Sequence, residues 1–397
     1  MLEAVRILDL TWFLGGPYAG QLLAQLGAEV VKVESPDGDP ARSAPPYQFD
    51  GDSAFFLSSN RGKIGVSLDL KHSEGREAFY DLVRHSDAVV YGYAPDVPKR
   101  LGIDFDTLAK INPKIVVAEL IGLHDQGEYV RAPAFDLIVQ AMGGIMSITG
   151  AEGGAPARVG YQIGDMGAGL FLALAVTSGL VRAAREGKGT CVQVSMLDCQ
   201  LSLLTWQAQN YLVADVIPKQ LGARNAVLVP SDAYRCSDGR YVVISPTSEH
   251  FWRTLCEVLG IPEVVSLPDF ADKSMRLKNV AQLTQILSDA FSKRTADEWA
   301  RALFEARVPA AKVLDVAEAV TQPIAQMRQM VEQVEKPQTG NKVRMLGNPF
   351  KYPESEPLAY PPMLGEATRQ VLRDVCGYSD DRMDALAASK AIYTGAA

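Results

Sequence analysis

Apolar positions in the first 120 residues fall in short runs that alternate with longer segments of helical spacing. The short runs, such as residues 29–34, are rich in β-branched residues, and several are apolar almost throughout, as in strands buried on both faces. The segments between them, such as residues 73–84, repeat apolar residues every three or four positions. This alternation predicts an α/β fold with a parallel sheet covered by helices on both faces.

The same patterns give a map of expected elements along the chain. We expect strands at 5–10, 29–34, 64–68, 88–93 and 114–120, and helices at 17–26, 73–84 and 104–110. A long apolar run that continues to Arg185 predicts a helix buried in the core, and a helical pattern runs from residue 201 towards 228. Beyond it we expect a hairpin at 231–245 turning at Asp238-Gly239, then helices at 249–259, 280–291 and 296–306. The remaining chain predicts short strands around Val331 and Val343, a Pro-rich extended stretch at 349–362, and helices at 366–375 and 380–392.

Length and charge limit the classes of protein to which the chain can belong. At 397 residues it exceeds what one hydrophobic core usually supports, so two domains are expected, the second being the helix-rich block. A net charge of -8 without runs of like charge argues against a nucleic-acid binder or a membrane-surface protein. The strand-like start leaves no room for a signal peptide, and no uncharged apolar stretch reaches the length of a membrane span, so we expect a cytoplasmic protein.

Cysteine and histidine usage gives no sign of a bound metal. The five cysteines are odd in number and widely spaced, which favours reduced thiols, and the four histidines are scattered. No Gly-x-Gly-x-x-Gly follows the first strand and no phosphate-binding P-loop is present. The main sequence evidence for a nicotinamide or flavin cofactor is therefore missing. We expect no metal and no tightly bound cofactor.

The strongest candidate for chemistry is Asp165. Gly164 precedes it, Gly167 and Gly169 follow, and the long apolar helix then begins, so its carboxylate is expected at a helix start. The free N–H groups of a first turn favour an anion, and glycines let a large ligand approach the backbone. The alternative is that Asp165 is an ordinary N-cap.

Ordered sequence blocks along almost the whole chain resemble those of the class III coenzyme A (CoA) transferases. That group contains formyl-CoA:oxalate transferase, the carnitine CoA-transferases and, as a side branch, α-methylacyl-CoA racemase. The matching blocks are residues 9–11, 16–20, 26–34, 38–42, 60–63, 68–71, 74–76, 100–102, 112–113, 133–137, 195–198, 347–349 and 364–366.

The resemblance implies a domain organisation and an assembly. A large Rossmann-like α/β domain would be formed by both chain ends, residues 1–200 and 330–397, and a smaller α+β domain by residues 225–325. Segments 201–224 and 326–360 would connect them. The family also implies an interlocked homodimer, in which the two chains are threaded through each other.

The resemblance further implies that Asp165 is a covalent nucleophile. Its carboxylate would attack an acyl-CoA, form a mixed anhydride and then carry CoA as an aspartyl thioester to a carboxylic acid acceptor. CoA would be a substrate, bound by Phe13, Leu14, Gly15, Leu68, Lys71, Tyr93, Arg100 and Asp136. Phe13 and Leu14 could instead be plain core residues, and Lys71 and Arg100 solvated charges at helix ends.

Some positions depart from the family pattern. Gly92 stands where many members carry Asn, and Ser35 where some carry a phosphate-binding Arg, a role that Arg42 could supply. Trp12 replaces a smaller or polar residue. The racemase branch places a histidine before the carboxylate of the 133–137 block, whereas this chain has Phe135 before Asp136. A racemase-like enzyme and a noncatalytic acyl-CoA-binding relative are therefore the alternatives to a transferase.

The acids exchanged are less well marked in the sequence. Arg131, Arg158, Tyr161 and Gln162 lie near the Asp165 block, and an arginine can pair bidentately with a distal carboxylate. On this basis we expect a dicarboxylate such as succinate as the donor acid. Arg158 could equally be an ordinary surface charge.

Overall fold

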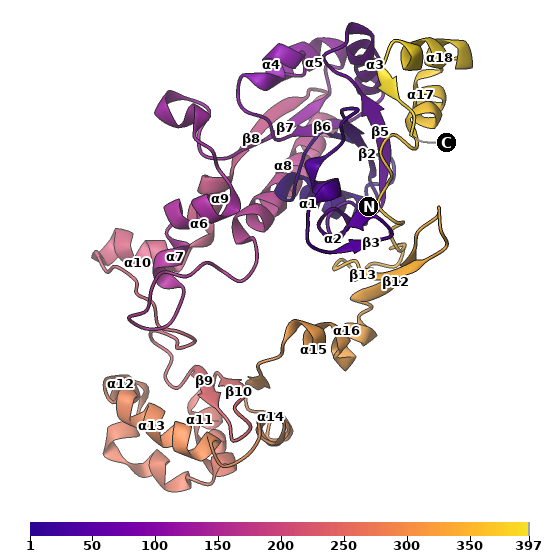
Figure 1. Ribbon diagram of the computed structural model, residues 1–397. Helices are drawn as coiled ribbons and strands as arrows, with labels where there is room; N and C mark the ends of the chain where they lie inside the picture. Colours follow the sequence, from indigo (N-terminus) through magenta and orange to yellow (C-terminus); the bar gives the residue numbers. More distant parts are fainter. Residues whose placement is uncertain (396–397) are drawn as a thin grey trace. The chain divides into compact units, whose positions relative to one another are not determined.

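The computed structural model describes residues 1–395, except for the side chain of Arg131. The chain divides into two compact units (Figure 1). Unit 1 comprises Met1–Ile145, Arg158–Val216 and the chain from Ile324 onwards, and unit 2 comprises Met146–Ala157 and Ile217–Pro323. Both chain ends therefore belong to unit 1.

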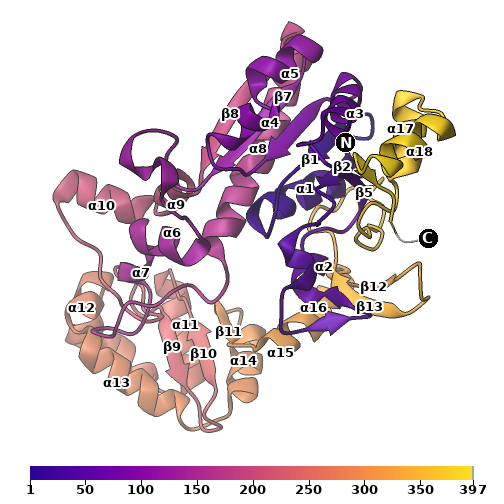
Figure 2. The same ribbon diagram turned by 45° about the horizontal axis from the view of Figure 1, so that its top comes forward.

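Unit 1 is built on a seven-stranded sheet with the order β14-β5-β2-β1-β6-β7-β8 (Figures 1 and 2). Its strands are β1 (Arg6–Asp9), β2 (Glu29–Glu34), β5 (Lys63–Leu68), β6 (Ala88–Tyr91), β7 (Val116–Ile121), β8 (Thr190–Ser195) and β14 (Ile392–Tyr393). All neighbours pair in parallel except β14, which runs antiparallel to β5. The predicted α/β fold with a mostly parallel sheet is confirmed.

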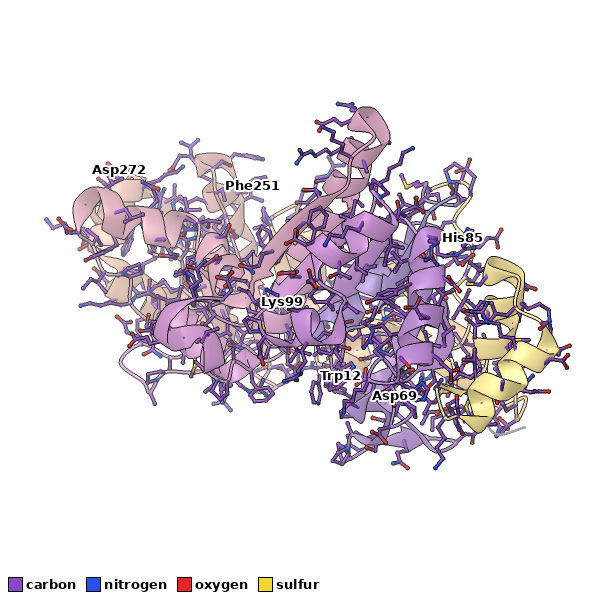
Figure 3. The ribbon with its side chains drawn as sticks, turned by 90° about the horizontal axis from the view of Figure 1, so that it is seen from above. Trp12, Asp69, His85, Lys99, Phe251 and Asp272 are labelled. Atoms are coloured by element: carbon purple, nitrogen blue, oxygen red, sulfur yellow. The ribbon has the colours of Figure 1, made fainter. Side chains whose placement is uncertain are left out.

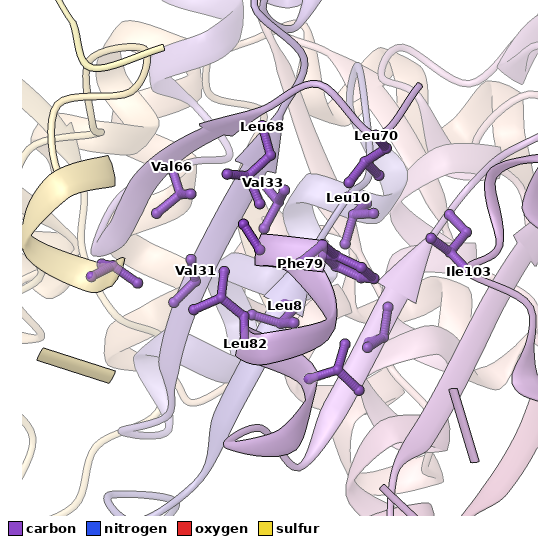
Figure 4. Close-up of a cluster of buried hydrophobic side chains, with 14 of the residues drawn as sticks. Leu8, Leu10, Val31, Val33, Val66, Leu68, Leu70, Phe79, Leu82 and Ile103 are labelled. Atoms are coloured by element: carbon purple, nitrogen blue, oxygen red, sulfur yellow. The ribbon is translucent and has the colours of Figure 1, made fainter. Parts of the chain in front are cut away.

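Helices cover both faces of this sheet. On one face lie α3 (Ser73–Arg84), α5 (Phe105–Ile111), α17 (Thr368–Cys376) and α18 (Asp380–Ala388). Their apolar side chains, with Phe79 and Leu82 of α3 at the centre, pack on Leu8, Val31 and Val66 of the strands (Figure 4). On the other face lie α1 (Gly15–Gln25) and α8 (Ile163–Glu186). The sheet is buried on both sides, which explains its nearly continuous apolar strands.

Smaller elements complete unit 1. They are α2 (Ala54–Leu57), α4 (Val97–Leu101), α6 (Asp136–Met142), α9 (Met196–Leu203), α10 (Trp206–Ala214) and the hairpins β3–β4 (Gln48–Phe49, Asp52–Ser53) and β12–β13 (Val331–Glu335, Lys342–Leu346). Leu57 of α2, Val334 and Met345 of the β12–β13 hairpin and Tyr360 form a small apolar cluster, against which Phe49 of β3 packs. Two short helices, α7 (Ile145–Ile148) and α16 (Pro323–Met327), lie at the boundaries between the units.

Unit 2 has its own core. A three-stranded antiparallel sheet, β11-β10-β9 (Ala310–Lys312, Tyr241–Ile244, Asp232–Arg235), packs with α11 (Glu249–Leu259), α13 (Val280–Phe291) and α14 (Ala296–Glu305). Trp252, Phe291 and Trp299 are almost fully buried there. The shorter α12 (Lys273–Lys278) and α15 (Val316–Thr321) lie beside them in the chain. The expected hairpin and three helices are all present, and Thr295 starts α14 with a capping box.

Three expectations about elements are wrong. Strand β8 was not expected, because as an edge strand it leaves Cys191 and Gln193 exposed and has a weak apolar signal. The pattern from residue 201 does not give one helix, because Thr205 has a φ of 44° and separates α9 from α10. The last helix ends at Ala388, since Lys390 has a φ of 63°, and Ile392 then enters the sheet.

Helix α8 is buried on one side only in the single chain. Leu172 and Val176 are fully buried, whereas Leu170, Leu174 and Val181 are 52%, 61% and 52% exposed. Within residues 1–395, α8 is the one helix long and apolar enough to cross a membrane, a test that core helices of soluble proteins also pass. The expected burial of this helix in the core is therefore confirmed for one of its faces and not for the other in a single chain.

Candidate active site

Asp165 lies in the first turn of α8, three residues after the N-cap Gln162. Gln162 provides no side-chain cap. The cap comes instead from Asp136, whose Oδ1 accepts hydrogen bonds from the backbone N–H groups of Gly164 (2.8 Å) and Asp165 (3.4 Å). The alternative that Asp165 is itself the N-cap is therefore wrong, and its side chain is left available for other chemistry.

Asp136 is held firmly in this capping position. It is the first residue of α6, and its second oxygen, Oδ2, accepts a hydrogen bond of 2.7 Å from Gln140 Nε2 one turn later. Gln140 Oε1 in turn accepts from the backbone N–H of Val159, on the segment that leads to α8. The carboxylate of Asp136 thereby joins α6 to the first turn of α8.

The environment of Asp165 disfavours its charged form. Burial, and then the nearby negative charge of Asp136, raise the pKa of Asp165 to about 6. The carboxylate is still mostly ionised at pH 7, but it is less solvated than a surface carboxylate. A perturbed acid at a helix N-terminus is the kind of group that marks a reacting centre.

Glycines let the backbone of α1 approach Asp165 closely. A Cβ added at Gly15 would lie 3.0 Å from the carbonyl oxygen of Asp165, and one at Gly169 would lie 2.6 Å from the carbonyl oxygen of Gly15. The predicted ligand-binding residue Gly15 is thus packed directly on the turn that carries Asp165. Its lack of a side chain is required by this contact.

An aromatic group lies at the carboxyl ends of β1 and β6. Trp12, labelled in Figure 3, follows β1 and packs edge-on against Tyr93, with ring centroids 5.7 Å apart. Tyr93 stacks on Tyr91 at 6.0 Å. Phe13 is 47% exposed, whereas Leu14 is buried. Strands β1 and β6 are neighbours at the point where the strand order reverses, which is where open α/β sheets bind ligands.

The other predicted CoA contacts differ in accessibility. Leu68 is 1% exposed and belongs to the hydrophobic core, so any contact that it makes with a ligand is limited to its edge. Lys71 is exposed, just beyond β5, where its backbone N–H is donated to Asp69 Oδ1. Arg100 is exposed on α4, 3.5 Å from Asp96, a surface pair that adds about 0–1 kcal/mol. Both cations are accessible to a phosphate, and their role stays a prediction.

Arg42, expected as a substitute phosphate ligand, is engaged within the protein. It pairs with Glu34 through two hydrogen bonds of 2.9 and 2.6 Å, donates to the carbonyl of Pro362 and lies over the ring of Phe56. Of the residues considered for a distal carboxylate, Arg158 and Tyr161 are exposed. The side chain of Arg131 lies outside the described part of the chain.

Two buried ion pairs were missed from the sequence. Lys63 lies 2.8 Å from Asp9, and Lys32 lies 3.0 Å from Asp39, with all four side chains at most 1% exposed. A signal was present for Lys32, which stands between two valines in the expected strand 29–34, whereas Lys63 directly precedes the expected strand 64–68. Both pairs are hydrogen-bonded to the backbone of the loop that carries Trp12 and Phe13.

A cavity of about 310 Å³ opens beside Tyr93 at the carboxyl ends of β6 to β8. The acidic residues in its lining are Asp104, Asp106, Glu119 and Asp125, against the single cation Lys99. Such a lining repels phosphate groups, so it does not suit a polyphosphate. Within residues 1–395, no cluster of three or more His, Cys, Asp or Glu side chains could hold a metal ion.

Known proteins resemble this chain over nearly its full length. The model of CoA-transferase family III matches residues 2–368. Succinyl-CoA:mesaconate CoA-transferase of Haloarcula hispanica is 35% identical, covering 90% of this chain and 91% of its own. Succinyl-CoA:glutarate CoA-transferase of Mus musculus is 32% identical, covering 98% and 90%.

A solved structure gives the same result. The crystal structure of a CAIB/BAIF family protein from Brucella suis is 31% identical and superposes with a TM-score of 0.84, covering 94% of this chain and 98% of the other. The similarity to known proteins therefore extends from the sequence to the fold. The protein is therefore an enzyme of CoA-transferase family III.

Proposed function

We propose that this enzyme moves CoA from succinyl-CoA, or another short dicarboxylyl-CoA, to a carboxylic acid acceptor through covalent intermediates on Asp165. The observation that carries the proposal is the carboxylate of Asp165, with its pKa raised to about 6, in a glycine-lined helix turn held by Asp136. Relatives named for succinyl-CoA in Haloarcula hispanica and Mus musculus support this choice of donor.

The first half of the reaction loads CoA onto the enzyme. A carboxylate oxygen of Asp165 attacks the thioester carbonyl, the C–S bond breaks, and CoA leaves as a thiolate, giving a mixed anhydride. The thiolate then attacks the aspartyl carbonyl. The anhydride C–O bond breaks, the donor acid leaves as its carboxylate, and an aspartyl-CoA thioester remains.

The second half delivers CoA to the acceptor. The acceptor carboxylate attacks the aspartyl thioester, releasing the thiolate and forming a second anhydride. Attack of the thiolate on the acyl carbon of the acceptor gives the new acyl-CoA and frees the carboxylate of Asp165. The activated acyl group is conserved in every step, so the energy of the thioester is not lost to water.

The protein groups around Asp165 suit this sequence of steps. The positive end of the α8 dipole favours the negative charge that develops on the aspartyl group. Asp136 orients that turn through its hydrogen bonds and stays noncovalent. Trp12, Phe13 and Tyr93 offer apolar faces for the nucleotide, with Lys71 and Arg100 for its phosphates.

Trapping the covalent intermediate tests this proposal. Incubation with succinyl-CoA without an acceptor should leave an aspartyl-CoA thioester, which borohydride reduces to an alcohol that peptide mass mapping locates at Asp165. Asp165→Asn should bind CoA but lose turnover, because an amide is not a competent nucleophile. A label on another carboxylate, or turnover by a verified Asp165→Asn protein, would refute the assignment.

The same mixtures separate the alternatives. A noncatalytic acyl-CoA-binding relative would transfer CoA to no member of a panel of carboxylic acids. A racemase-like enzyme would exchange the α-proton of a 2-methylacyl-CoA with deuterium from solvent, without transfer of CoA. Phe135, which is 65% exposed, supplies no base for that exchange.

The choice of a dicarboxylate donor depends on the exposed guanidinium of Arg158. It donates a hydrogen bond of 3.3 Å to the carbonyl of Val159, its neighbour in the chain. Arg158→Leu should therefore raise the KM for succinyl-CoA more than the KM for butyryl-CoA, which lacks the distal carboxylate. Equal changes in both constants would remove this residue from the recognition of the donor.

A further inference from the structure

The backbone of the loop formed by residues 11–14 is hydrogen-bonded to the buried Lys32–Asp39 ion pair. Lys32 lies in β2 and Asp39 precedes a short 3-10 turn, and both side chains are fully buried. Lys32 Nζ donates to the carbonyl of Thr11 at 3.0 Å. Asp39 Oδ1 accepts from the backbone N–H of Phe13 at 3.2 Å. The pair thus binds the backbone on both sides of Trp12.

Phe13 needs such support. Its φ of 63° lies in the left-handed region that residues with a Cβ seldom adopt. Backbone of this kind persists where surrounding contacts fix it, and it is concentrated at functional sites. The hydrogen bond to Asp39 is the contact that fixes the amide of Phe13.

The second buried pair holds the two ends of the same loop. Asp9 Oδ1 accepts from the backbone N–H of Thr11 at 2.9 Å, and Lys63 Nζ donates to the carbonyl of Pro17 at 2.8 Å, in the first turn of α1. Asp9 and Lys63 pair at 2.8 Å. Between these fixed ends, Gly15 packs on the backbone of Asp165.

We propose that Asp39 is a positioning residue for acyl-CoA binding, acting through the backbone N–H of Phe13, with Lys32 balancing the charge of its buried carboxylate. This role rests on the proposed function, because it assumes that Trp12 and Phe13 face the nucleotide of CoA. The pair itself is out of reach of any substrate, since both side chains are 0% exposed. It sets where the two aromatic rings stand beside Tyr93.

The opposing explanation is that the pair serves stability alone. Replacing a buried ion pair by uncharged residues of similar size is often neutral, whereas removing one partner leaves an unpaired charge. In a single variant, a loss of activity caused by misfolding could therefore not be told from one caused by displacement of the loop at residues 11–14. Two double variants avoid this, because both remove the charge pair and differ in whether residue 39 keeps an oxygen that can accept from the backbone N–H groups of Phe13 and Ala41.

The first variant, Lys32→Met/Asp39→Asn, keeps a side-chain oxygen that can accept from the amide of Phe13. The second, Lys32→Met/Asp39→Leu, has no acceptor. A control, Arg276→Met/Glu249→Gln, removes the ion pair of the almost fully buried Arg276 in unit 2. All three should be compared with the unaltered protein by hydrogen–deuterium exchange of the peptide covering residues 11–16, and by steady-state kinetics.

In the Leu variant, the amide hydrogens of this peptide should exchange at least tenfold faster. The KM for acyl-CoA should rise at least tenfold, while the KM for the acceptor acid changes less than twofold. The Asn variant and the unit 2 control should stay within threefold of the unaltered protein in both measurements. Unchanged exchange in the Leu variant would overturn the proposal, as would faster exchange with an unchanged KM. If the unaltered enzyme transferred no CoA, the proposed function would fail, while the exchange measurement would still decide whether Asp39 holds the loop.

Discussion

As the proposed nucleophile, the carboxylate of Asp165 would have to be ionised to attack a thioester, so its pKa would set the acid limit of the reaction. With a pKa of about 6, the single-turnover rate of aspartyl-CoA formation should be flat above pH 7 and fall about tenfold per pH unit well below pH 6. Rapid-quench measurements between pH 4.5 and 8.5 would measure this acid limb of the pH–rate profile. A rate independent of pH over the whole range would contradict the assignment.

Asp136 shifts that limb through its charge. Asp136→Asn removes a negative neighbour and so lowers the pKa of Asp165, while the amide oxygen can still cap α8. The acid limb of this variant should therefore move to lower pH, with a modest loss of rate from weaker capping. A shift to higher pH would show that the two carboxylates do not repel each other.

Asp165 should also cost the protein stability. Its folded pKa of about 6 exceeds the ordinary value of 3.8, so the folded state binds the proton more tightly than the unfolded chain. Stability is then lost as the pH rises from about 4 to 6, and the loss is complete above pH 6. Asp165→Asn should stabilise the protein by about 1–2 kcal/mol at pH 7.5 after allowing for partial exposure, and by less at pH 5.

Thermal unfolding at the two pH values measures this difference. Asp37→Asn, at an exposed position, serves as the matched control and should change the Tm by less than 1 °C at either pH. A lower Tm for Asp165→Asn at pH 7.5 would mean that the charge contributes to folding. Residues that are retained at a cost in stability are typical of functional sites.

Sequence patterns located Asp165 but not what surrounds it. Glycines flanking an acid before an apolar run were enough to predict a carboxylate at a helix start. That Asp136 caps this helix could not be predicted, because residues 136 and 164 approach only in the folded chain. The Lys32–Asp39 and Lys63–Asp9 pairs were missed for the same reason, since a lysine in a strand does not reveal its partner.

At the scale of elements, the close packing of α1 on α8 depends on glycine. A methyl group at Gly169 would lie 2.6 Å from the carbonyl oxygen of Gly15 and 3.0 Å from the ring of Tyr18, which no rotamer change relieves for a backbone atom. Gly169→Ala should therefore destabilise the protein by about 1–3 kcal/mol and displace the first turn of α8. Urea unfolding would measure this, with Gly160→Ala, where a Cβ meets nothing within 4 Å, as control. Equal urea midpoints for Gly169→Ala and Gly160→Ala would show that α1 and α8 can move apart without loss of stability.

The helices and strands predicted best are those whose apolar residues clearly mark one buried face or two buried faces. Helices α3, α11 and α13 and strand β2 have the expected bounds, because their apolar faces are buried within one chain. Strands β8 and β14 were missed at the two edges of the sheet. An edge strand pairs on one side only, and its composition is set less by burial than that of a central strand.

At the scale of the whole molecule, the surface of a single chain is unusually apolar along α6, α8 and α10. The exposed side chains there include Leu137, Ile138, Met142, Leu170, Leu174, Tyr211, Leu212 and Val213, with Leu212 and Val213 73% and 75% exposed. Patches of this kind mark protein interfaces. They support the homodimer implied by the family resemblance, which stays a prediction.

Light scattering coupled to gel filtration tests the assembly. The protein should elute as a species of about twice 43.0 kDa at every concentration, because interlocked chains cannot part without unfolding. Dilution should produce no folded monomer before far-ultraviolet circular dichroism is lost. A monomer with full helical signal at nanomolar concentration would contradict the interlocked topology.

The pairing of β14 with β5 bears on how the chain folds as it leaves the ribosome. Unit 2 can bury Trp252, Phe291 and Trp299 once Val308 has been synthesised. The face of β5 that carries Leu68, in contrast, is covered only when Val371, Leu372, Met383 and Ile392 have been made, more than 300 residues further along the chain (371 − 68 = 303). Until those residues are made, a nascent chain presents an open strand edge and an uncovered apolar face, a state prone to aggregation. We expect this enzyme to depend on chaperones during translation more than its finished fold would indicate.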